Sequence, residues 1–314
     1  MNAQTNNKLL SAVVVCGPTG IGKTSFAIEL ARRFRGEIIG ADSMQLYRHM
    51  DIGTAKPTAE ERAAVKHHMV DVVEPDAHFD AKMYAHMAYA SVVSLAENGI
   101  LPFIVGGTGL YIKALIHGLF ESIKIDASVR ERLKKEAQEL GGSHLHSRLK
   151  TCDPAAAARI HGNDTYRIVR ALEIFETTGK PMSDTQQQHQ FKPQRLQTVK
   201  LGLHMEREDL YQRIDKRVDI MLDQGLFEEV KRLVEAGYSL ELKSMKSLGY
   251  RHMAAFLNKE LDWDETVRIL KRDTRHYAKR QMTWFKADPE IVWLELESID
   301  EATSMVKAFI AKCG

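Results

Sequence analysis

Cysteine is scarce in this sequence, which argues against folds that depend on disulfides or on bound zinc. Only three cysteines occur in 314 residues, Cys16, Cys152 and Cys313, and their spacing matches neither a disulfide framework nor a metal-binding motif. We expect reduced thiols, with Cys16 filling a buried strand. The adjacent His67 and His68 point in opposite directions on an extended segment, so we expect both to be structural rather than metal ligands.

Long hydrophobic runs are also missing. The longest apolar stretches have the length of a strand and are too short to span a membrane, and residues 1–8 lack the apolar core of a secretory signal. We therefore expect a cytoplasmic protein. Neither sign of charge dominates, because 44 Lys and Arg balance 42 Asp and Glu for a net charge of +2. Net charge alone identifies no nucleic-acid partner, so that argument must depend on where the charges cluster.

What the sequence does contain is an alternation of short apolar segments and helical segments. Residues 9–16, 37–41 and 102–105 are apolar enough for strands buried on both faces of a sheet, and residues 69–73 form a further candidate strand. Residues 22–35 and 81–97 are predicted helices, and glycine stops each of them. This order predicts an α/β fold with a doubly wound parallel sheet.

The middle of the chain has a different character. From residue 123 charged helical segments replace the strands, and they lead to the polar run 186–190. Residues 199–204 and 291–296 return to strand character, and residues 209–223 and 264–286 are predicted helices. We therefore expect a sheet domain formed by residues 1–122 and 199–314, interrupted by a helical insertion domain at residues 123–198.

A phosphate-binding motif, the P-loop G-x-x-x-x-G-K-[ST], follows the first predicted strand and opens the first predicted helix. Its glycines let backbone N–H groups turn toward phosphate oxygens, and the helix N-terminus and the lysine add positive charge. The threonine can ligate Mg²⁺. The residues predicted to bind a polyphosphate are Gly17, Pro18, Thr19, Gly20, Ile21, Gly22, Lys23 and Thr24, with Thr24 as the Mg²⁺ ligand.

A second glycine-rich turn follows the strand at residues 102–105. It reads Gly106-Gly107-Thr108-Gly109 and holds no carboxylate, whereas an ordinary P-loop ATPase has an acidic residue at such a strand end. The turn is either a second backbone surface facing the phosphates or a tight strand-to-helix connection. Thr108 is its one side chain placed to donate a hydrogen bond.

Six blocks of sequence resemble the tRNA dimethylallyltransferases, the tRNA isopentenyltransferase family, in the family's order and over nearly the whole chain. The blocks are Asp42-Ser43-x-Gln45-x-Tyr47, Asp51-Ile52-Gly53-Thr54-Ala55-Lys56-Pro57, Gly106-Gly107-Thr108-Gly109-Leu110-Tyr111, Asn163-Asp164 with Arg167 and Arg170-Ala171-Leu172-Glu173, Gly249-Tyr250-Arg251, and Lys279-Arg280-Gln281-x-Thr283-Trp284-Phe285. Gly20 and Ile21 stand where relatives often have alanine and serine. No Cys/His zinc finger is present at the C-terminal end, so the chain resembles the bacterial form.

The resemblance implies transfer of the dimethylallyl group from dimethylallyl pyrophosphate to N6 of the adenosine on the 3′ side of the anticodon, position 37 of tRNA. It implies a P-loop core with a helical insertion that grips the anticodon arm, and we expect a monomer. The residues expected to contact tRNA are Asp42, Ser43, Met44, Gln45, Thr108, Arg130, Tyr166, Arg167, Ile168, Val169, Arg170, Gly249, Tyr250, Arg251, Arg272, Arg275 and Lys279.

The implied reaction assigns roles to four catalytic candidates. Asp42 ends a predicted strand and is expected to hydrogen-bond to N6 and accept its proton. Two alternatives remain for Asp42, capping of the following turn or ligation of Mg²⁺ through water. Lys23, Thr108 and Arg217 are expected to stabilise charge on the departing pyrophosphate. For Arg217, which shares a helix face with Arg213, a solvated surface position is the alternative.

A row of cations follows one face of the predicted helix 264–286, comprising Arg268, Arg272, Arg275, Lys279 and Lys286. Another face has the spacing of a buried core, comprising Val267, Leu270, Thr274, Tyr277 and Trp284. The cations can follow an RNA backbone, although such a face is more often merely solvated. Tyr166 with the nearby arginines offers stacking surfaces for splayed bases, and the target adenine must leave its own stack.

Three other functions fit parts of this pattern. A prenyltransferase acting on free AMP or ADP would use the same P-loop and Asp42, but it would need neither the insertion nor the basic helix. A P-loop nucleoside or metabolite kinase, or a noncatalytic RNA-binding NTPase switch, is disfavoured because no acidic residue follows Val105. A tRNA prenyltransferase is therefore the preferred hypothesis.

Overall fold

The computed structural model describes residues 9–118, 127–184 and 194–313. The chain divides into two compact units, one made of Met1–Gly118 and Gln194–Gly314 and the other of Leu119–Pro193. The expected start of the insertion at residue 123, the polar run 186–190 and residues 1–8 lie outside the described residues. Residues 196–198, which we assigned to the insertion, belong instead to a strand of the sheet.

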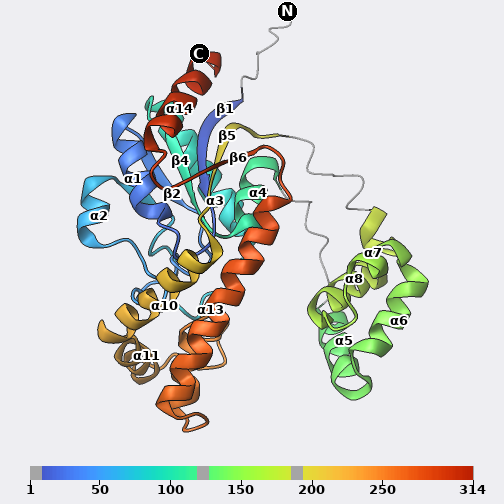
Figure 1. Cartoon of the computed structure of the whole chain (residues 1–314). Helices are drawn as coiled ribbons and strands as arrows, with labels where there is room; N and C mark the ends of the chain where they lie inside the picture. The colour runs from blue at the N-terminus through green and yellow to red at the C-terminus, as the bar shows by residue number, and fades with distance from the viewer. Residues whose placement is uncertain (1–8, 119–126, 185–193, 314) are drawn as a thin grey trace, which may run out of the picture. The chain divides into compact units, whose positions relative to one another are not determined.

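Six parallel strands form the sheet of the first unit, in the order β3-β2-β4-β1-β5-β6 (Figure 1). They are β1 (Leu10–Cys16), β2 (Glu37–Gly40), β3 (His67–His68), β4 (Pro102–Gly106), β5 (Leu196–Leu203) and β6 (Ile291–Leu294). The chain leaves β1 toward β2, returns to place β4 beside β1, and then continues to β5 on the other side. This reversal confirms the doubly wound fold, and its switch point between β1 and β4 is where such sheets bind ligands.

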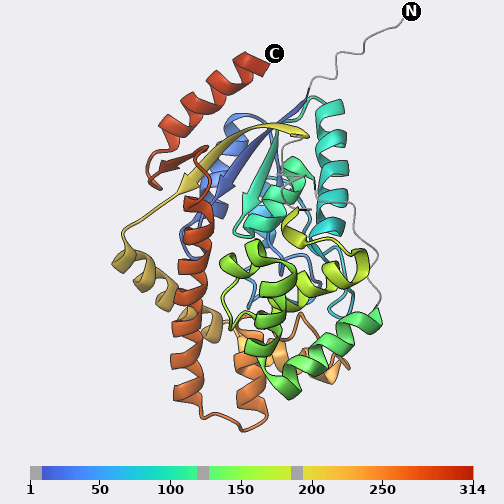
Figure 2. The ribbon, with the colours of Figure 1, turned by 90° about the vertical axis from the view of Figure 1, so that its right-hand side faces the viewer.

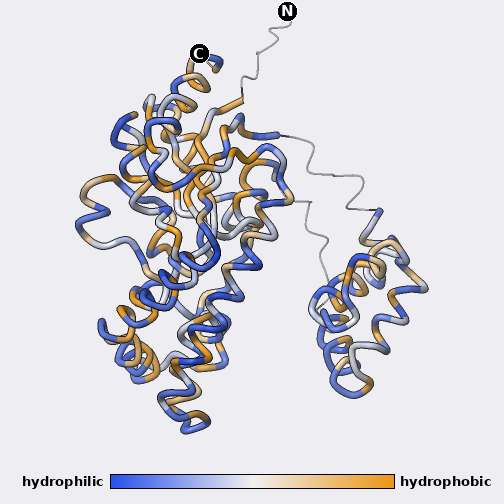
Figure 3. The backbone as a smooth tube through the Cα atoms, viewed as in Figure 1, coloured by the Kyte–Doolittle hydropathy of each residue, from blue (hydrophilic) through white to orange (hydrophobic). Residues whose placement is uncertain are grey.

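Helices cover both faces of this sheet (Figure 2). The helices of the unit are α1 (Lys23–Arg33), α2 (Ala59–Ala64), α3 (Ala81–Glu97), α4 (Gly109–His117), α10 (Arg207–Asp223), α11 (Leu226–Glu235), α12 (Tyr250–Leu257), α13 (Trp263–Lys286) and α14 (Ile299–Cys313). Val13 and Val15 of β1 join a core with α1 and α14, whereas Val14 and Cys16 join a core with α3 and α4. The strands therefore lie among apolar segments in Figure 3, and Cys16 is buried as predicted.

The strand predicted at residues 69–73 is wrong. The third strand is instead His67–His68, which pairs with Ile38 and Ile39 of β2. Met69 and Asp71 have φ angles of 61° and 56°, and such left-handed residues end an extended segment. Val73 retains only an isolated bridge to Tyr47.

The expected core face of α13 needs one correction. Leu270 and Thr274 are buried, Val267 and Tyr277 are only half-buried, and Trp284 is 45% exposed. The buried residues of the helix are Thr266, Leu270, Thr274, Ala278, Gln281 and Phe285. Helical periodicity therefore placed the apolar face correctly along most of the helix and failed at its last turn, where Phe285 is buried in place of Trp284.

A buried carboxylate fixes the loop at residues 51–53. Glu229 of α11 is 4% exposed and accepts hydrogen bonds from the backbone N–H groups of Asp51, Ile52 and Gly53 at 2.9, 2.9 and 3.2 Å. The Tyr250 hydroxyl donates a fourth bond at 2.5 Å. Four donors satisfy a charge that would otherwise be costly to bury. Because Tyr250 is 0% exposed, its side chain supports this loop from inside and offers no surface to tRNA, contrary to our expectation.

The second unit is a helical bundle with its own core. Its described helices are α5 (Ala127–Leu140), α6 (Gly142–Cys152), α7 (Pro154–Arg159) and α8 (Thr165–Thr178). The core includes Leu133, Leu145, Leu149, Ile168 and Leu172. Ile168 and Val169 are 0% and 7% exposed, so these two expected tRNA contacts are core residues whose side chains do not reach the surface. In the described parts of both units, no helix has the length and apolarity needed to cross a membrane.

The first prediction concerns the Glu229 cluster. Tyr250→Phe should lower the free energy of unfolding by about 1.5–3 kcal/mol, because it removes a hydrogen bond to a buried charge. Tyr238→Phe is the matched control: its hydroxyl donates to the exposed Glu74 at 3.2 Å, so we expect a much smaller loss of unfolding free energy. Urea unfolding followed by tryptophan fluorescence measures both, since all three tryptophans lie in this unit. Equal losses in the two variants would contradict the assigned role of Glu229.

Candidate active site

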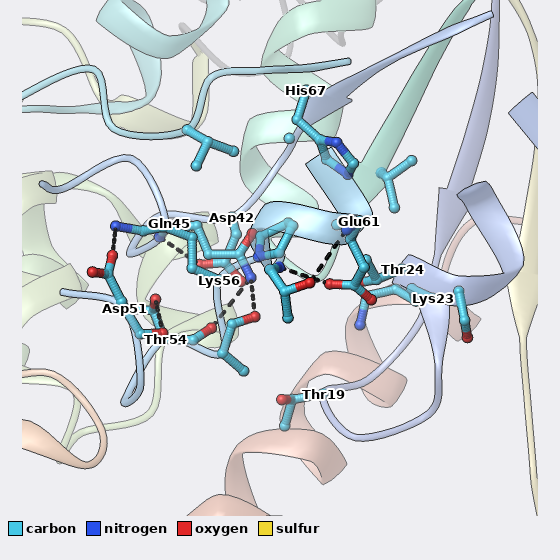
Figure 4. Close-up of a pocket in the computed structure, with 18 of the residues that line it drawn as sticks. Thr19, Lys23, Thr24, Asp42, Gln45, Asp51, Thr54, Lys56, Glu61 and His67 are labelled. Atoms are coloured by element: carbon cyan, nitrogen blue, oxygen red, sulfur yellow. Dashed lines mark hydrogen bonds and ion pairs between the residues drawn. The ribbon is translucent and has the colours of Figure 1, made fainter. Parts of the chain in front are cut away.

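A cavity of about 580 Å³ opens beside the P-loop at the switch point of the sheet. Its walls come from the P-loop, the ends of β2 and β4, residues 51–58, α2 and α10. Lys23 and Thr24 face the same space as Asp42 (Figure 4). The predicted site residues that line it are Thr19, Gly20, Gly22, Lys23, Thr24, Asp42, Gln45 and Arg217.

The P-loop forms because glycine occupies the positions that other residues avoid. Gly20 and Gly22 have φ angles of 83° and 102°, in the left-handed region. A Cβ at Gly20 would also come within 2.9 Å of the Ile214 side chain, so the loop packs directly against α10. Gly22 caps α1 without a side-chain hydrogen bond. Lys23, Thr24 and Ser25, the first residues of α1, line the cavity, so an anion there would lie at the end of the helix that favours negative charge.

Lys23, Arg217 and Asp42 meet at this cavity, although they are far apart in the sequence. Lys23 donates a hydrogen bond from Nζ to the Pro18 carbonyl at 2.8 Å. Burial and the neighbouring Arg217 lower the pKa of Lys23 to about 8, and Asp42 opposes the shift. Burial also lowers the pKa of Arg217, which is half-buried. Two cations held together in this way form a site for a strongly anionic ligand, and Arg217 is not a solvated surface residue.

Asp42 begins the turn that follows β2. Its Oδ1 accepts hydrogen bonds from the backbone N–H groups of Met44 and Gln45 at 2.8 and 3.4 Å. Asp42 therefore caps the turn, which is one of the two alternatives expected for it from the sequence. The carboxylate also lines the cavity. Oδ1 is used by the turn, and Oδ2 is the oxygen with which Asp42 can meet a ligand.

Thr108 holds the Asp42 turn in place. Its Oγ1 accepts a hydrogen bond from the Ser43 N–H at 3.1 Å, and its own N–H donates to the Ala41 carbonyl at 3.1 Å. A Cβ at Gly106 would lie 2.1 Å from that same carbonyl. The glycine-rich turn is therefore a close strand-to-helix connection that brings Thr108 to the residue following Asp42.

Gln281 of α13 is a site residue to which sequence reasoning assigned no role. Its side chain is buried and bridges two loops: Oε1 accepts from the Thr19 N–H at 2.8 Å, and Nε2 donates to the Gly107 carbonyl at 2.9 Å. The signal was present in the sequence, because a glutamine at a core position of an amphipathic helix needs partners for its amide.

Lys56 and His67 also line the cavity and were not predicted to do so. Lys56 is nearly buried, and its Nζ contacts Asp51 at 2.5 Å and Asp71 at 2.6 Å. His67 bonds through Nδ1 to the Val65 carbonyl at 2.7 Å, and burial lowers its pKa. The described residues contain no group of three or more His, Cys, Asp or Glu side chains that could hold a metal ion.

The cationic face of α13 is neutralised over its first half. Arg268 pairs with Glu265 at 2.6 Å, Arg272 with Asp273 at 2.9 Å and Arg275 with Asp215 at 2.6 Å. Lys279, Arg280 and Lys286 in the second half are exposed, and none of them forms an ion pair with another described residue. The uncompensated positive charge of the helix therefore lies in its C-terminal half, which adjoins the glycine-rich turn through Gln281.

Comparisons with known proteins agree on one family. Residues 45–288 match the sequence model of the family described as IPP transferase. The chain is 53% identical over 95% of its length to the tRNA dimethylallyltransferase of Desulfosudis oleivorans, of which it covers 95%. It is 45% identical over 95% of its length to the tRNA dimethylallyltransferase of Acetivibrio thermocellus, again covering 95% of that chain.

Two solved structures resemble the chain over nearly its full length. One is the tRNA isopentenylpyrophosphate transferase of Bacillus halodurans, with a TM-score of 0.72, 38% identity, and coverage of 97% of this chain and 98% of that one. The other is a eukaryotic dimethylallyltransferase described as acting on tRNA, with a TM-score of 0.80, 27% identity, and coverage of 96% and 80%.

The second prediction follows from the low pKa of Lys23. Affinity for pyrophosphate should fall by about tenfold per pH unit above pH 8, because the free protein loses the ammonium charge that the ligand needs. In Lys23→Arg the cation persists at every pH tested, so this dependence should disappear. Calorimetric titrations from pH 7 to 9.5 measure both proteins with the same ligand, which cancels the titration of pyrophosphate itself. Identical pH profiles would contradict the assigned role of Lys23.

Proposed function

Because the chain belongs to the IPP transferase family, we propose that it is a tRNA dimethylallyltransferase that acts on N6 of adenosine 37. The donor is dimethylallyl pyrophosphate, and pyrophosphate is released. The observation that carries this proposal is the meeting of Lys23 and Arg217 with Asp42 at one cavity. Two cations suit a departing pyrophosphate, and a carboxylate beside them suits an attacking amine.

The P-loop supplies the pyrophosphate half of the site. The N–H groups at the start of α1 and the charges of Lys23 and Arg217 bind the ligand's phosphates. In the reaction the allylic C–O bond breaks and negative charge accumulates on the leaving pyrophosphate. The same donors then stabilise the transition state more than the ground state, because they are already fixed in a partly buried site.

Asp42 supplies the acceptor half of the site. As the new bond forms between N6 and the allylic carbon, N6 must lose a proton, and Oδ2 of Asp42 receives it. Thr108 acts by holding the Ser43 N–H, and so fixes the turn that carries Asp42. We therefore assign Thr108 a positioning role, in addition to the hydrogen-bond donor role expected from the sequence.

A divalent metal generally assists tRNA prenyltransferases, and we propose Mg²⁺ for this chain. Thr24 and Asp42 line the same cavity, and no larger set of acidic ligands surrounds them in the described residues. This sparse donor set fits Mg²⁺, which keeps several waters and takes phosphate oxygens as ligands. Thr24 would hold the ion, and the bound ion would neutralise charge on pyrophosphate; water-mediated ligation by Asp42 is the alternative to its role as proton acceptor.

We propose that the helical unit Leu119–Pro193 binds the anticodon stem-loop. On α8, Tyr166 is 84% exposed and Arg167 is exposed, so the two side chains offer a ring and a cation to RNA. Arg130 and Arg170 are both anchored on the buried Glu173, at 2.5 and 3.2 Å. Such anchoring holds each guanidinium in a fixed orientation.

On the sheet unit, the remaining candidates for tRNA contact are Ser43, Met44, Gln45, Arg251, Arg272, Arg275 and Lys279, whereas Gly249 is buried, as Tyr250 is. Arg272 and Arg275 must exchange an acidic partner for phosphate on binding, which reduces their net contribution to tRNA affinity.

We further propose that the protein is a monomer in the cytoplasm, where its tRNA substrate is present.

The third prediction tests the reaction itself. Incubation with undermodified tRNA and dimethylallyl pyrophosphate should yield N6-dimethylallyladenosine at position 37, detected by mass spectrometry of the nucleosides. Reactions with AMP or ADP in place of tRNA should give no product, because a mononucleotide lacks the anticodon stem-loop that the helical unit is proposed to bind. Efficient transfer to AMP, or steady ATP hydrolysis stimulated by tRNA in the absence of transfer, would contradict the proposed function.

The fourth prediction separates proton acceptance from turn capping at Asp42. Asp42→Asn keeps an oxygen that can accept from the Met44 and Gln45 N–H groups, so the turn should persist. The amide cannot take a proton, and the single-turnover rate should fall by about 10²–10⁴ while the affinities for tRNA and pyrophosphate change little.

Lys23→Ala provides the contrast to Asp42→Asn, because it should weaken both pyrophosphate binding and turnover. If Asp42 mainly organises the metal, Asp42→Asn should instead weaken binding of dimethylallyl pyrophosphate, and extra Mg²⁺ should restore part of the rate. A near-normal single-turnover rate in Asp42→Asn at saturating Mg²⁺ would rule out proton acceptance by Asp42.

A further inference from the structure

An exposed indole ring lies beside the acceptor half of the site. Trp284 is 45% exposed, and its five-membered ring rests on Gly109: a Cβ there would lie 2.0 Å from Nε1 and 2.1 Å from Cδ1. Gly109 directly follows Thr108, whose hydroxyl holds the N–H of Ser43, the residue after Asp42. The ring is therefore fixed at the edge of the turn that presents Asp42.

The backbone that carries Trp284 is held rigidly. Three residues earlier, Gln281 is hydrogen-bonded to the P-loop and to Gly107. One residue later, Phe285 is 3% exposed and fills the core. Anchors on both sides set the position of the indole before any ligand arrives, which reduces the entropy lost when a partner stacks on it.

Packing alone does not account for this tryptophan. Nearly half of its surface faces solvent, and Phe285 already provides the apolar contact of this helical turn. Trp263 at the other end of α13 is similarly exposed, at 39%, but it packs edge-to-face against Phe256 and Phe227 at ring distances of 5.1 and 6.4 Å. Trp263 therefore has a structural explanation, and it is a natural control for Trp284.

The charge around Trp284 indicates what the ring contacts. Lys279, Arg280 and Lys286 are exposed, without an ion-pair partner among the described residues, and Arg280 lies one turn before Trp284 on the same side of the helix. Arg280 lies over the ring of Tyr277 at 5.8 Å. An exposed aromatic ring with an unpaired cation one turn away on its side of the helix is complementary to a nucleobase attached to its phosphates.

We propose that Trp284 is a stacking platform for the tRNA base next to the adenosine that is modified. The inference rests on the proposed function. To reach Asp42, the target adenine must leave its stack, and this exposes the face of a neighbouring base. The indole replaces the lost partner and so favours the RNA conformation in which the target base has been extruded. Trp284 is thus a binding residue for the RNA rather than a participant in the chemistry.

Fluorescence provides the direct test, because the chain has only three tryptophans. In the variant Trp263→Phe/Trp293→Phe the emission comes from Trp284 alone, and binding of an anticodon stem-loop RNA should quench it strongly. In the variant Trp284→Phe/Trp293→Phe the emission comes from Trp263, and the same RNA should leave it nearly unchanged. An RNA with an abasic nucleotide at one of the two positions flanking the target should bind without quenching Trp284, and this identifies the stacked base.

Kinetics gives a second, independent measurement in the otherwise unmodified protein. Trp284→Leu should weaken productive tRNA binding by about 10- to 100-fold, and Trp284→Phe should restore most of it. Affinity for dimethylallyl pyrophosphate should stay the same in both variants, which also checks that they are folded. For the abasic RNA that abolishes quenching, Trp284→Leu and the unmodified protein should bind with equal affinity.

The outcomes of these experiments are distinguishable. Strong binding and transfer with no change in Trp284 emission, or equal activity of Trp284→Leu and the unmodified protein, would overturn the stacking role and leave the transferase function intact. Absence of transfer by the unmodified protein would overturn the function itself. Quenching of Trp263 and Trp284 to the same extent would show a general effect of RNA binding and would also count against the proposal.

Discussion

The organisation of this protein depends on two hydrogen bonds made by one buried amide. Gln281 joins the N–H of Thr19 to the carbonyl of Gly107, and so connects the P-loop, the glycine-rich turn and the long helix α13. Each of these segments contributes a different part of the candidate site: the loop that carries Lys23, the support of Asp42, and the cationic helix. A buried amide is costly unless all its partners are present, so the three segments reach their final positions together.

Buried charges in the sheet unit fall into two groups. Glu229 has four hydrogen-bond donors, and Lys56 has two carboxylates and a carbonyl, so both are satisfied within the protein. Lys23 and Arg217 instead both have lowered pKa values, Lys23 through burial and the neighbouring Arg217, and Arg217 mainly through burial. The satisfied charges hold the walls of the cavity in place. Lys23 and Arg217 repel each other, so an anion bound between them would stabilise both in their charged forms. Buried charges elsewhere in the sheet unit are paired with opposite charges or hydrogen-bond donors. The two neighbouring cations depart from this pattern, and such a departure is typical of a functional site.

Much of this arrangement could be predicted because it is encoded locally. The P-loop, the strands at residues 9–16 and 102–105, and the approach of Asp42 to Lys23 follow from apolar runs, glycine spacing and the rule that parallel strands end at one edge. The bridge made by Gln281, the pairing of Lys56 and the exposure of Trp284 depend instead on which segment packs against which. Periodicity assigns a helix face to the core, but it cannot tell that α13 extends to the edge of the sheet, where Phe285 is buried and Trp284 is not. The third strand was misplaced because left-handed residues at Met69 and Asp71 are not evident from residue type.

The chain leaves and re-enters the sheet unit at almost the same point. Arg195 donates its backbone N–H to the carbonyl of Ile116 at 2.7 Å. The point where the chain leaves the sheet unit after α4 therefore lies directly beside the point where it returns before β5. The helical unit has its own core and interrupts only this junction. In evolutionary terms, the gene segment for residues 119–193 could be exchanged, lengthened or lost while β1, β4 and β5 kept their pairing, since a short turn would close the remaining gap. The sheet unit and the helical unit can therefore diversify at different rates along a single polypeptide.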